Sequence, residues 1–381
     1  MNKNRSILWM SFITVISLTV SSCGSRQLDA LNPLESAVDV ADLAEVAEVA
    51  ALVPLEEGEG SILTYPSKML LLPDGTMVVK DSGGKVLAFS PEGRFVCRVG
   101  AKGRGPGEYT SVQDICYDDR NRTVCILDRG KILRYHAADG SFAGEVEIPR
   151  HNYDEFAPDG QGGFYLFAAA PDSDSYDFTE TFNTVSRIPA EGGQPTESFI
   201  SRKDYIMNTS LISRAWDGGY YLRPLEGEGV LYRLDKKISP VPRVDFGSKA
   251  MPQHYMINNG MPDFARYMMS DYFKNLLYVH DTGTMWYFQA IGPKAVGYHF
   301  VFAKSTEKGV MWKEVNDGDT PSIVMASDKD SFYVMVFTPA QFLGMDPARL
   351  SPVNRLVASA IKETGLSLNN NPLIAKITFR Q

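Results

Sequence analysis

Residues 68–81 read KMLLLPDGTMVVKD, in which two apolar runs, 69–72 and 77–79, flank the residues Pro73-Asp74-Gly75. Asp-Gly between apolar runs is a strong short-range signal for a β-hairpin, because these residues adopt turn conformations at little energetic cost. The stretch therefore predicts two antiparallel strands joined by a tight turn.

The same unit of strand, turn and strand recurs along the chain. Each copy has Asp, Gly or Asn at its centre and apolar flanks. The five further copies lie at 114–128, 155–168, 211–224, 276–289 and 322–337. The turn centres, from Asp74 to Asp328, follow one another at intervals of 40 to 64 residues. This spacing is close to the period of a β-propeller blade, lengthened by insertions.

A third apolar strand follows each hairpin, and most units continue into a second turn and a fourth strand. The third strands read KVLAFS, KILRYH, NTVSRI, GVLYRL, AVGYHF and LIAKITF. Four strands repeated six times predict an all-β fold, a six-bladed β-propeller of four-stranded blades. A β-sandwich of many hairpins is the main alternative, but it explains the sixfold count less well.

The sixth unit ends after its third strand, at 373–379, and so lacks a fourth. The apolar segment 44–56, AEVAEVAALVPLE, precedes the first unit and has no hairpin partner of its own. We expect this N-terminal strand to complete the last blade, which would join the ends of the ring and remove an open sheet edge. A short amphipathic helix is the alternative, because Ala and Glu favour helices.

The N-terminus has the pattern of an export signal. A charged start, MNKNR, precedes an apolar run too short to span a membrane comfortably, and the run ends in VSSCG with Cys23 as its cysteine. This ending resembles the lipobox of bacterial lipoproteins, which implies lipidation of Cys23. We therefore predict a signal peptide at 1–22, a lipidated cysteine and tether at 23–40, and the propeller at 41–381. An ordinary signal peptide with an incidental cysteine is the alternative.

Composition bounds the partners and the location. The chain of 381 residues carries a net charge of −8, which disfavours a nucleic-acid partner. The predicted partner through the lipid is the membrane, at the cell envelope. Because no acidic residue directly follows Cys23, we favour outer-membrane attachment facing the periplasm over display on the cell surface.

Three cysteines remain beyond Cys23, and they do not have the spacing of a zinc site. Cys116 and Cys125 lie symmetrically about the turn DDRNR, so a hairpin would place them opposite each other. Both a cross-strand disulfide and a pair of buried free thiols fit this position. Cys97 has no such partner in sequence.

The stretch FVCRVGAKGRGPGEY at 95–109 follows LPDGTMVVKD and KVLAFSPEGRF, and NNNPLIAKITF stands at 369–379. These motifs resemble the six-bladed β-propeller lipoproteins of Gram-negative gut bacteria, which are related in shape to NHL-repeat propellers. The resemblance covers essentially the whole mature chain and implies a propeller fold and export. It implies little about activity.

Irregular insertions are expected on one face of the propeller. Segments 170–183 and 339–371 lie between second and third strands, and 250–275 joins two blades. In a propeller these connections share one face with the glycine-rich stretch at 99–111, whereas tight hairpin turns share the other. Because loops on a rigid scaffold generally carry binding, we expect the insertion-bearing face to be the working one.

We predict that this face makes the ligand contacts of a binding or interaction module, and that the module takes an unidentified protein or an oligosaccharide. The ligand-binding candidates are Arg104, Glu108, Tyr109, Tyr255 and Tyr267. Aromatic faces stack on sugars or apolar ligands, and charged groups orient them. The alternative is structural: a salt bridge between blades with a packed tyrosine, and tyrosines that belong to the buried stripe of a helix.

Enzyme activity is the competing hypothesis. The chain lacks the common hydrolase, zinc-protease and phosphate-loop motifs, and no cofactor is predicted. Lactonase- and lyase-type propellers gather carboxylates and amides at the channel mouth. Here the corresponding residues, and the ligands of a divalent cation such as calcium in this alternative, are Asp114, Asp154, Asn208 and Asn275. The acidic loop 172–180 is better explained as solvated.

Overall fold

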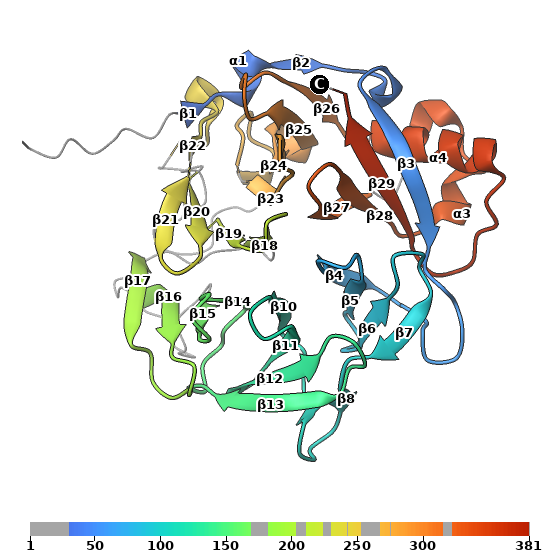
Figure 1. The fold of residues 1–381 in the computed structure, drawn as a ribbon. Helices are drawn as coiled ribbons and strands as arrows, with labels where there is room; N and C mark the ends of the chain where they lie inside the picture. Colours follow the sequence, from blue (N-terminus) through green and yellow to red (C-terminus); the bar gives the residue numbers. More distant parts are fainter. Residues whose placement is uncertain are drawn as a thin grey trace, which may run out of the picture.

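The computed structural model describes residues 30–168, 182–202, 211–223, 230–241, 243–252, 267–274, 276–314 and 322–380. Within these ranges, six antiparallel sheets stand around a central axis (Figure 1). The fold is an all-β six-bladed propeller of four-stranded blades, as the repeat predicts. The innermost strand of each blade faces the axis, so that six inner strands surround the central channel.

Counted from the axis outward, blade 1 consists of β4 (Pro66–Leu71), β5 (Met77–Asp81), β6 (Val86–Phe89) and β7 (Phe95–Arg98). In the same order, blade 2 consists of β10 (Asp114–Asp118), β11 (Thr123–Asp128), β12 (Lys131–His136) and β13 (Phe142–Glu147). Blade 3 consists of β14 (Glu155–Pro158), β15 (Phe164–Phe167), β16 (Phe182–Ile188) and β17 (Glu197–Arg202).

Blade 4 consists of β18 (Ile212–Arg214), β19 (Tyr220–Leu222), β20 (Leu231–Leu234) and β21 (Ile238–Val241). Blade 5 consists of β23 (Leu276–Asp281), β24 (Met285–Ile291), β25 (Gly297–Ala303) and β26 (Gly309–Lys313). Blade 6 consists of β27 (Ile323–Ser327), β28 (Phe332–Val336), β29 (Leu373–Phe379) and β3 (Ala47–Pro54).

Strand β3 closes the ring. It pairs antiparallel with β29, from Leu373 opposite Pro54 to Phe379 opposite Ala47, so the first long strand of the chain lies beside the last (Figure 1). The strand assignment of this segment is therefore confirmed. The short 3₁₀ turn η1 (Leu43–Glu45) overlaps the first two residues of the segment 44–56, and the strand follows it.

Residues 30–46, which precede β3, lie against the outside of the propeller. Strand β1 (Ala30–Leu31) pairs with β22 (Arg243–Val244), and β2 (Ala37–Asp39) pairs with the outer strand β26 of blade 5. Between them lies the short helix α1 (Pro33–Ser36), which Asn32 caps. Backbone pairing and the buried side chain of Leu31 thus hold residues 30–39 against the propeller.

The hydrophobic core lies between neighbouring blades. One cluster joins blades 1 and 2 around Val78 and Ile126, and equivalent clusters fill the other blade interfaces. Strands such as β6 and β11 are buried at every position because both of their faces pack on neighbouring blades. The outer strand β7 alternates between half-buried and exposed positions. This difference explains the continuous apolar runs of the inner strands.

The two faces of the propeller differ in their connections. The insertion face carries the links between blades and the connections from second to third strands, and the hairpin face carries the tight turns such as 72–76. On the insertion face, the described part of the insertion 339–371 forms α3 (Pro339–Phe342) and α4 (Pro352–Thr364) beside blade 6 (Figure 1). Ser351 caps the start of α4, and Gly365, at φ 64°, ends it.

Short 3₁₀ turns complete the described elements: η2 (Gly247–Lys249), η4 (Pro293–Ala295) and η5 (Pro347–Arg349). None of the helices in the described ranges combines the length and apolar character that crossing a membrane requires.

The hairpin of blade 2 has the register that the cysteine spacing predicts. Cys116 lies directly opposite Cys125, and both side chains are fully buried. The structure has the two as free thiols, and Cys97 is a half-buried free thiol. Of the two alternatives for the pair, the structure therefore shows the buried thiols. Burial raises the pKa of the Cys116 thiol well above its ordinary value.

Candidate functional site

A pocket of about 330 Å³ lies at the mouth of the central channel on the insertion face. It is bounded by the first residues of inner strands and the last residues of second strands, so every blade except blade 4 contributes to its wall. The lining residues are Pro66, Ser67, Lys68, Lys80, Gln113, Asp114, Asp154, Glu155, Tyr278, Ile323, Met325 and Phe337. Its volume is at the lower end of the range for small-molecule sites.

Blades 1 and 2 supply a charged part of this wall. The Lys68 ammonium donates to both carboxylate oxygens of Asp114, at 2.7 and 2.9 Å, and Asp114 also accepts from the Phe156 backbone N–H at 3.2 Å. These contacts join the inner strands of three successive blades. The Lys80 ammonium donates to the Gln113 carbonyl at 2.5 Å, and burial lowers the pKa of Lys80.

Glu155 extends the charged part of the wall into blade 3. Its carboxylate accepts hydrogen bonds from the backbone N–H groups of Leu211 and Ile212, at 2.9 and 2.7 Å, and thereby fixes the start of β18. Burial, with the nearby charge of Asp114, raises the pKa of Glu155 to about 7 against the opposing charge of Lys68. A carboxyl that titrates near neutral pH in a pocket is a recognised mark of functional sites.

Blades 5 and 6 supply an apolar part of the wall. Ile323 and Met325 of β27 line the pocket together with Phe337, which directly follows β28. Tyr278 of β23 adds an aromatic ring, and burial, with the charges of Glu155 and Glu314, raises the pKa of its hydroxyl. The Tyr278 hydroxyl is therefore a hydrogen-bonding group at neutral pH. The pocket is charged on one side and apolar on the other.

Arg214 crosses the other end of the channel, near the hairpin face. It extends from the end of β18 in blade 4, and its guanidinium donates to the Leu71 carbonyl of blade 1 at 3.0 Å and to the Asp119 carboxylate of blade 2 at 2.8 Å. The Arg214 side chain is 10% exposed. These contacts join blade 4 to blades 1 and 2 across the channel at this end.

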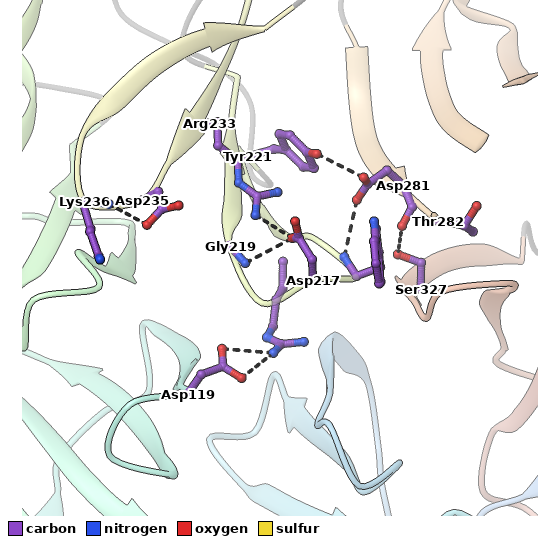
Figure 2. A network of polar contacts seen from close by, with 12 residues as sticks. Asp119, Asp217, Gly219, Tyr221, Arg233, Asp235, Lys236, Asp281, Thr282 and Ser327 are labelled. Atoms are coloured by element: carbon purple, nitrogen blue, oxygen red, sulfur yellow. Dashed lines mark hydrogen bonds and ion pairs between the residues drawn. The ribbon is translucent and has the colours of Figure 1, made fainter. Parts of the chain in front are cut away.

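Figure 2 shows the polar contacts of the hairpin face. The Asp281 carboxylate of blade 5 accepts from the Tyr221 hydroxyl of blade 4 at 3.1 Å. It also accepts from the Lys304 ammonium at 2.7 Å. The Ser327 hydroxyl of blade 6 donates to the Asp281 carbonyl at 2.6 Å. These contacts fix blades 4, 5 and 6 to one another.

A second hollow, of about 360 Å³, lies on the hairpin face between blades 2, 3 and 4. Its acidic residues include Asp119 and Asp217, which Figure 2 shows on adjoining turns. Arg214 and Arg233 donate to these two carboxylates at 2.8 and 2.5 Å. Their charges are thus compensated within the protein, and we place the candidate site at the channel mouth.

The glycine-rich stretch forms a self-contained loop between blades 1 and 2. Short strands β8 (Ala101–Lys102) and β9 (Glu108–Tyr109) pair parallel at its base. Gly107 has φ 71°, and a Cβ at this position would stand 2.7 Å from the Phe142 ring, so the loop requires glycine there. Gly105 has no such backbone requirement.

The ligand candidates of this loop take different roles. Arg104 is exposed on the loop, as expected. The Glu108 carboxylate accepts from the Gly105 N–H at 2.7 Å, within the loop. Tyr109 is not beside Arg104 at the surface but fully buried between blades 1 and 2, which corrects its expected exposure: the alternation of β9 points its ring into the core. A ligand on the insertion face cannot reach that ring.

The structure describes only some of the other predicted residues. Tyr267 is half-buried at the start of the described segment 267–274. Asp114 and Asp154 both line the pocket, but Asp114 is already paired with Lys68. The remaining candidates lie outside the described residues: Cys23, Tyr255, Asn208, Asn275 and the acidic loop 172–180. Among the residues that the structure describes, no three His, Cys, Asp or Glu side chains are placed to hold a metal ion.

Lys68, Lys80 and Glu155 are pocket residues that the sequence patterns did not indicate. Each is a charged residue directly beside a buried apolar run, in PSKMLL, MVVKD and EFAP. A charge in such a position was the available signal, since an ionisable group at a buried strand end needs a partner or a wet cavity.

Comparison with known proteins bears on the fold and the family. No curated protein matches the sequence. Among solved structures, a crystal structure from Bacteroides fragilis, described as that of a candidate exported protein, superposes with a TM-score of 0.69 at 16% identity, covering 91% of this chain and 98% of that chain. At this identity the likeness concerns the fold alone. The model of the family described as domain of unknown function DUF4934 matches residues 31–377, and the chain therefore belongs to this family.

Proposed function

We propose that the protein is an exported, lipid-anchored propeller that binds a small ligand at the channel mouth on the insertion face. The observation that carries the proposal is the pocket of about 330 Å³ at this face, which five of the six blades line. Its wall is already organised, because Lys68, Asp114 and Glu155 are held by contacts between blades. A preformed concave site of mixed polarity suits reversible binding.

Export and anchoring rest on the N-terminal pattern and on the similarity to the Bacteroides fragilis protein. Several acyl chains on Cys23 would hold the protein at a membrane far better than one. We propose attachment to the outer membrane, facing the periplasm.

Changing Cys23 to alanine should release the protein from the membrane fraction and abolish incorporation of labelled fatty acid. The control is Cys97→Ala, which removes a half-buried thiol elsewhere and should leave the protein in the membrane fraction. Fractionation and metabolic labelling measure both effects. Unchanged partition of Cys23→Ala would contradict the anchor.

The binding proposal predicts a specific effect of Lys80. We expect a thermal-shift screen of neutral sugars, sugar acids, amino sugars, amino acids and short peptides to identify a class that stabilises the wild type. A ligand at one hundred times its Kd adds about 2.7 kcal/mol to the free energy of unfolding. Lys80→Met should remove this stabilisation, because its ammonium faces the pocket.

Lys85→Met is the matched control for this screen. Lys85 is five positions further along blade 1, and its ammonium donates to the Ile62 carbonyl at an exposed site rather than facing the pocket. The proposal fails if no class stabilises the wild type, or if the stabilisation is equal in Lys80→Met and Lys85→Met.

A divalent-metal lactonase or lyase remains the alternative function. It requires Asn208 and Asn275 to join Asp114 and Asp154, and Asp114 would have to exchange Lys68 for the metal. Calcium alone, added to the same screen, tests this alternative: a rise in melting temperature that Asp154→Ala removes would favour it.

A further inference from the structure

The charges of the pocket favour an uncharged ligand. Two lysines, Lys68 and Lys80, line the pocket together with three acidic residues, Asp114, Asp154 and Glu155. A ligand carboxylate would meet the three acids, and a ligand ammonium would meet the two lysines. A ligand with several hydroxyl groups avoids both penalties, since a hydroxyl donates to carboxylates and accepts from ammonium groups.

The two-sided wall adds a second requirement. Hydroxyl groups suit the side formed by Lys80 and Glu155, but Ile323, Met325 and Phe337 need an apolar surface against them. A sugar ring in its chair form meets both demands, because its hydroxyl groups project from the edge while its C–H groups form an apolar face. The volume of about 330 Å³ suits a unit of this size rather than a long chain.

An exposed aromatic residue stands beside the rim. Tyr65 is 72% exposed and directly precedes Pro66, which lines the pocket. Its backbone is fixed, because Asp81 accepts from the N–H groups of Thr64 and Tyr65, at 2.5 and 3.3 Å, and the Ser82 N–H donates to the Tyr65 carbonyl at 2.9 Å. An exposed aromatic ring on a rigid backbone provides a stacking surface at low entropic cost.

From these observations we propose that the channel mouth binds the end of a neutral oligosaccharide, with its terminal sugar ring in the pocket and the next sugar on Tyr65. This inference rests on the proposed binding function and specifies its ligand class. The polar edge of the terminal ring faces Lys80 and Glu155, and its apolar face lies on Ile323, Met325 and Phe337.

The test is calorimetric titration of the full chain, purified in a detergent without sugar groups, with matched pairs of probes. Each pair contrasts a neutral with a charged tetramer: N-acetylglucosamine against glucosamine, and galactose against galacturonate. Tetramers of β-1,4-glucose, α-1,4-glucose and β-1,4-mannose extend the neutral set. We expect a neutral tetramer to bind at least tenfold more tightly than its charged counterpart.

Tyr65→Ala should weaken binding of the tetramer about tenfold and change binding of the single sugar less than about twofold. The matched control is Ile62→Ala, which removes a 49% exposed side chain from the same loop and should leave both affinities unchanged. Lys80→Met should weaken binding of the tetramer and of the single sugar to the same extent, because Lys80 lines the pocket.

Three outcomes overturn the inference. If charged probes bind as tightly as neutral ones and lose affinity in Lys80→Met, the binding function stands and the neutral-sugar assignment fails. If no sugar binds while another class in the screen does, the binding function also stands and the neutral-sugar assignment also fails. If sugars bind but Lys80→Met and Tyr65→Ala leave their affinity unchanged, the site itself is elsewhere.

Discussion

Replacing Asp128 with alanine should destabilise the propeller by about 4 kcal/mol, because a buried carboxylate that accepts several hydrogen bonds cannot be removed without leaving its donors unpaired. Asp128 ends β11 and is 1% exposed. It accepts from the N–H and hydroxyl groups of Thr110 at 2.7 and 2.9 Å, from those of Ser111 at 3.1 and 2.8 Å, and from the Arg129 N–H at 2.8 Å. These contacts fix the chain where it leaves the glycine-rich loop and enters blade 2.

Chemical denaturation measures this effect, and Asp128→Asn is the control. Asparagine keeps one acceptor oxygen at the same position, so we expect Asp128→Asn to lose clearly less stability than Asp128→Ala. Equal losses in the two variants would show that packing, and not hydrogen bonding, explains the effect.

The pH dependence of stability gives an independent check on Asp128. Burial opposes ionisation, but the hydrogen bonds from Thr110, Ser111 and Arg129 hold the pKa of this carboxyl below its usual range. A group whose pKa is lower in the folded state stabilises fully above its unfolded pKa, and that contribution is lost as the pH falls through the folded pKa. The wild type should therefore lose more stability below about pH 4 than Asp128→Ala does.

Asn371→Ala should cost about 3 kcal/mol, since three backbone groups lose their partner, two of them in buried hydrogen bonds. Asn371 is 2% exposed. Its side-chain oxygen accepts from the Leu63 N–H at 2.9 Å, and its amide donates to the carbonyls of Glu56 and Ser61 at 2.8 and 2.9 Å. It thus fixes the start of β29 to the connection between β3 and blade 1.

The neighbouring Asn370→Ala is the matched control. Asn370 donates hydrogen bonds to the exposed carboxylate of Glu57. Because water can replace the lost side-chain contact there, the stability of Asn370→Ala should stay close to that of the wild type. Thermal and urea unfolding compare the two variants. A loss in Asn371→Ala no larger than that in Asn370→Ala would contradict a special role of Asn371 in ring closure.

Much of the fold could be predicted because the information is local. The hairpin at 68–81 contains its own turn residues and apolar runs, and its repetition indicates the blades without knowledge of distant contacts. The role of Asn371 could not be read in this way: the sequence marks NNNPLIAKITF as the closing strand, but the partner of Asn371 is 308 positions away.

The candidate site was harder to predict for the same reason. Lys80, Glu155 and Met325 belong to three blades, and only the closed ring brings them to one pocket. In the glycine-rich loop, by contrast, the local sequence led to a wrong prediction for one residue. Its turn residues suggest exposure throughout, but Tyr109 lies in a two-residue strand whose alternation turns the ring inward.

Strand β3 also constrains the order in which the chain can fold. It leaves the ribosome or a membrane translocation channel long before its partner β29, because its residue Pro54 pairs with the distant Leu373. Until β29 has emerged, β3 has no partner strand, and blade 6 is incomplete. The blades that are contiguous in sequence can assemble earlier, so closure of the ring is the concluding step. A chain truncated before β29 would lose the strand that joins β3 to the rest of blade 6.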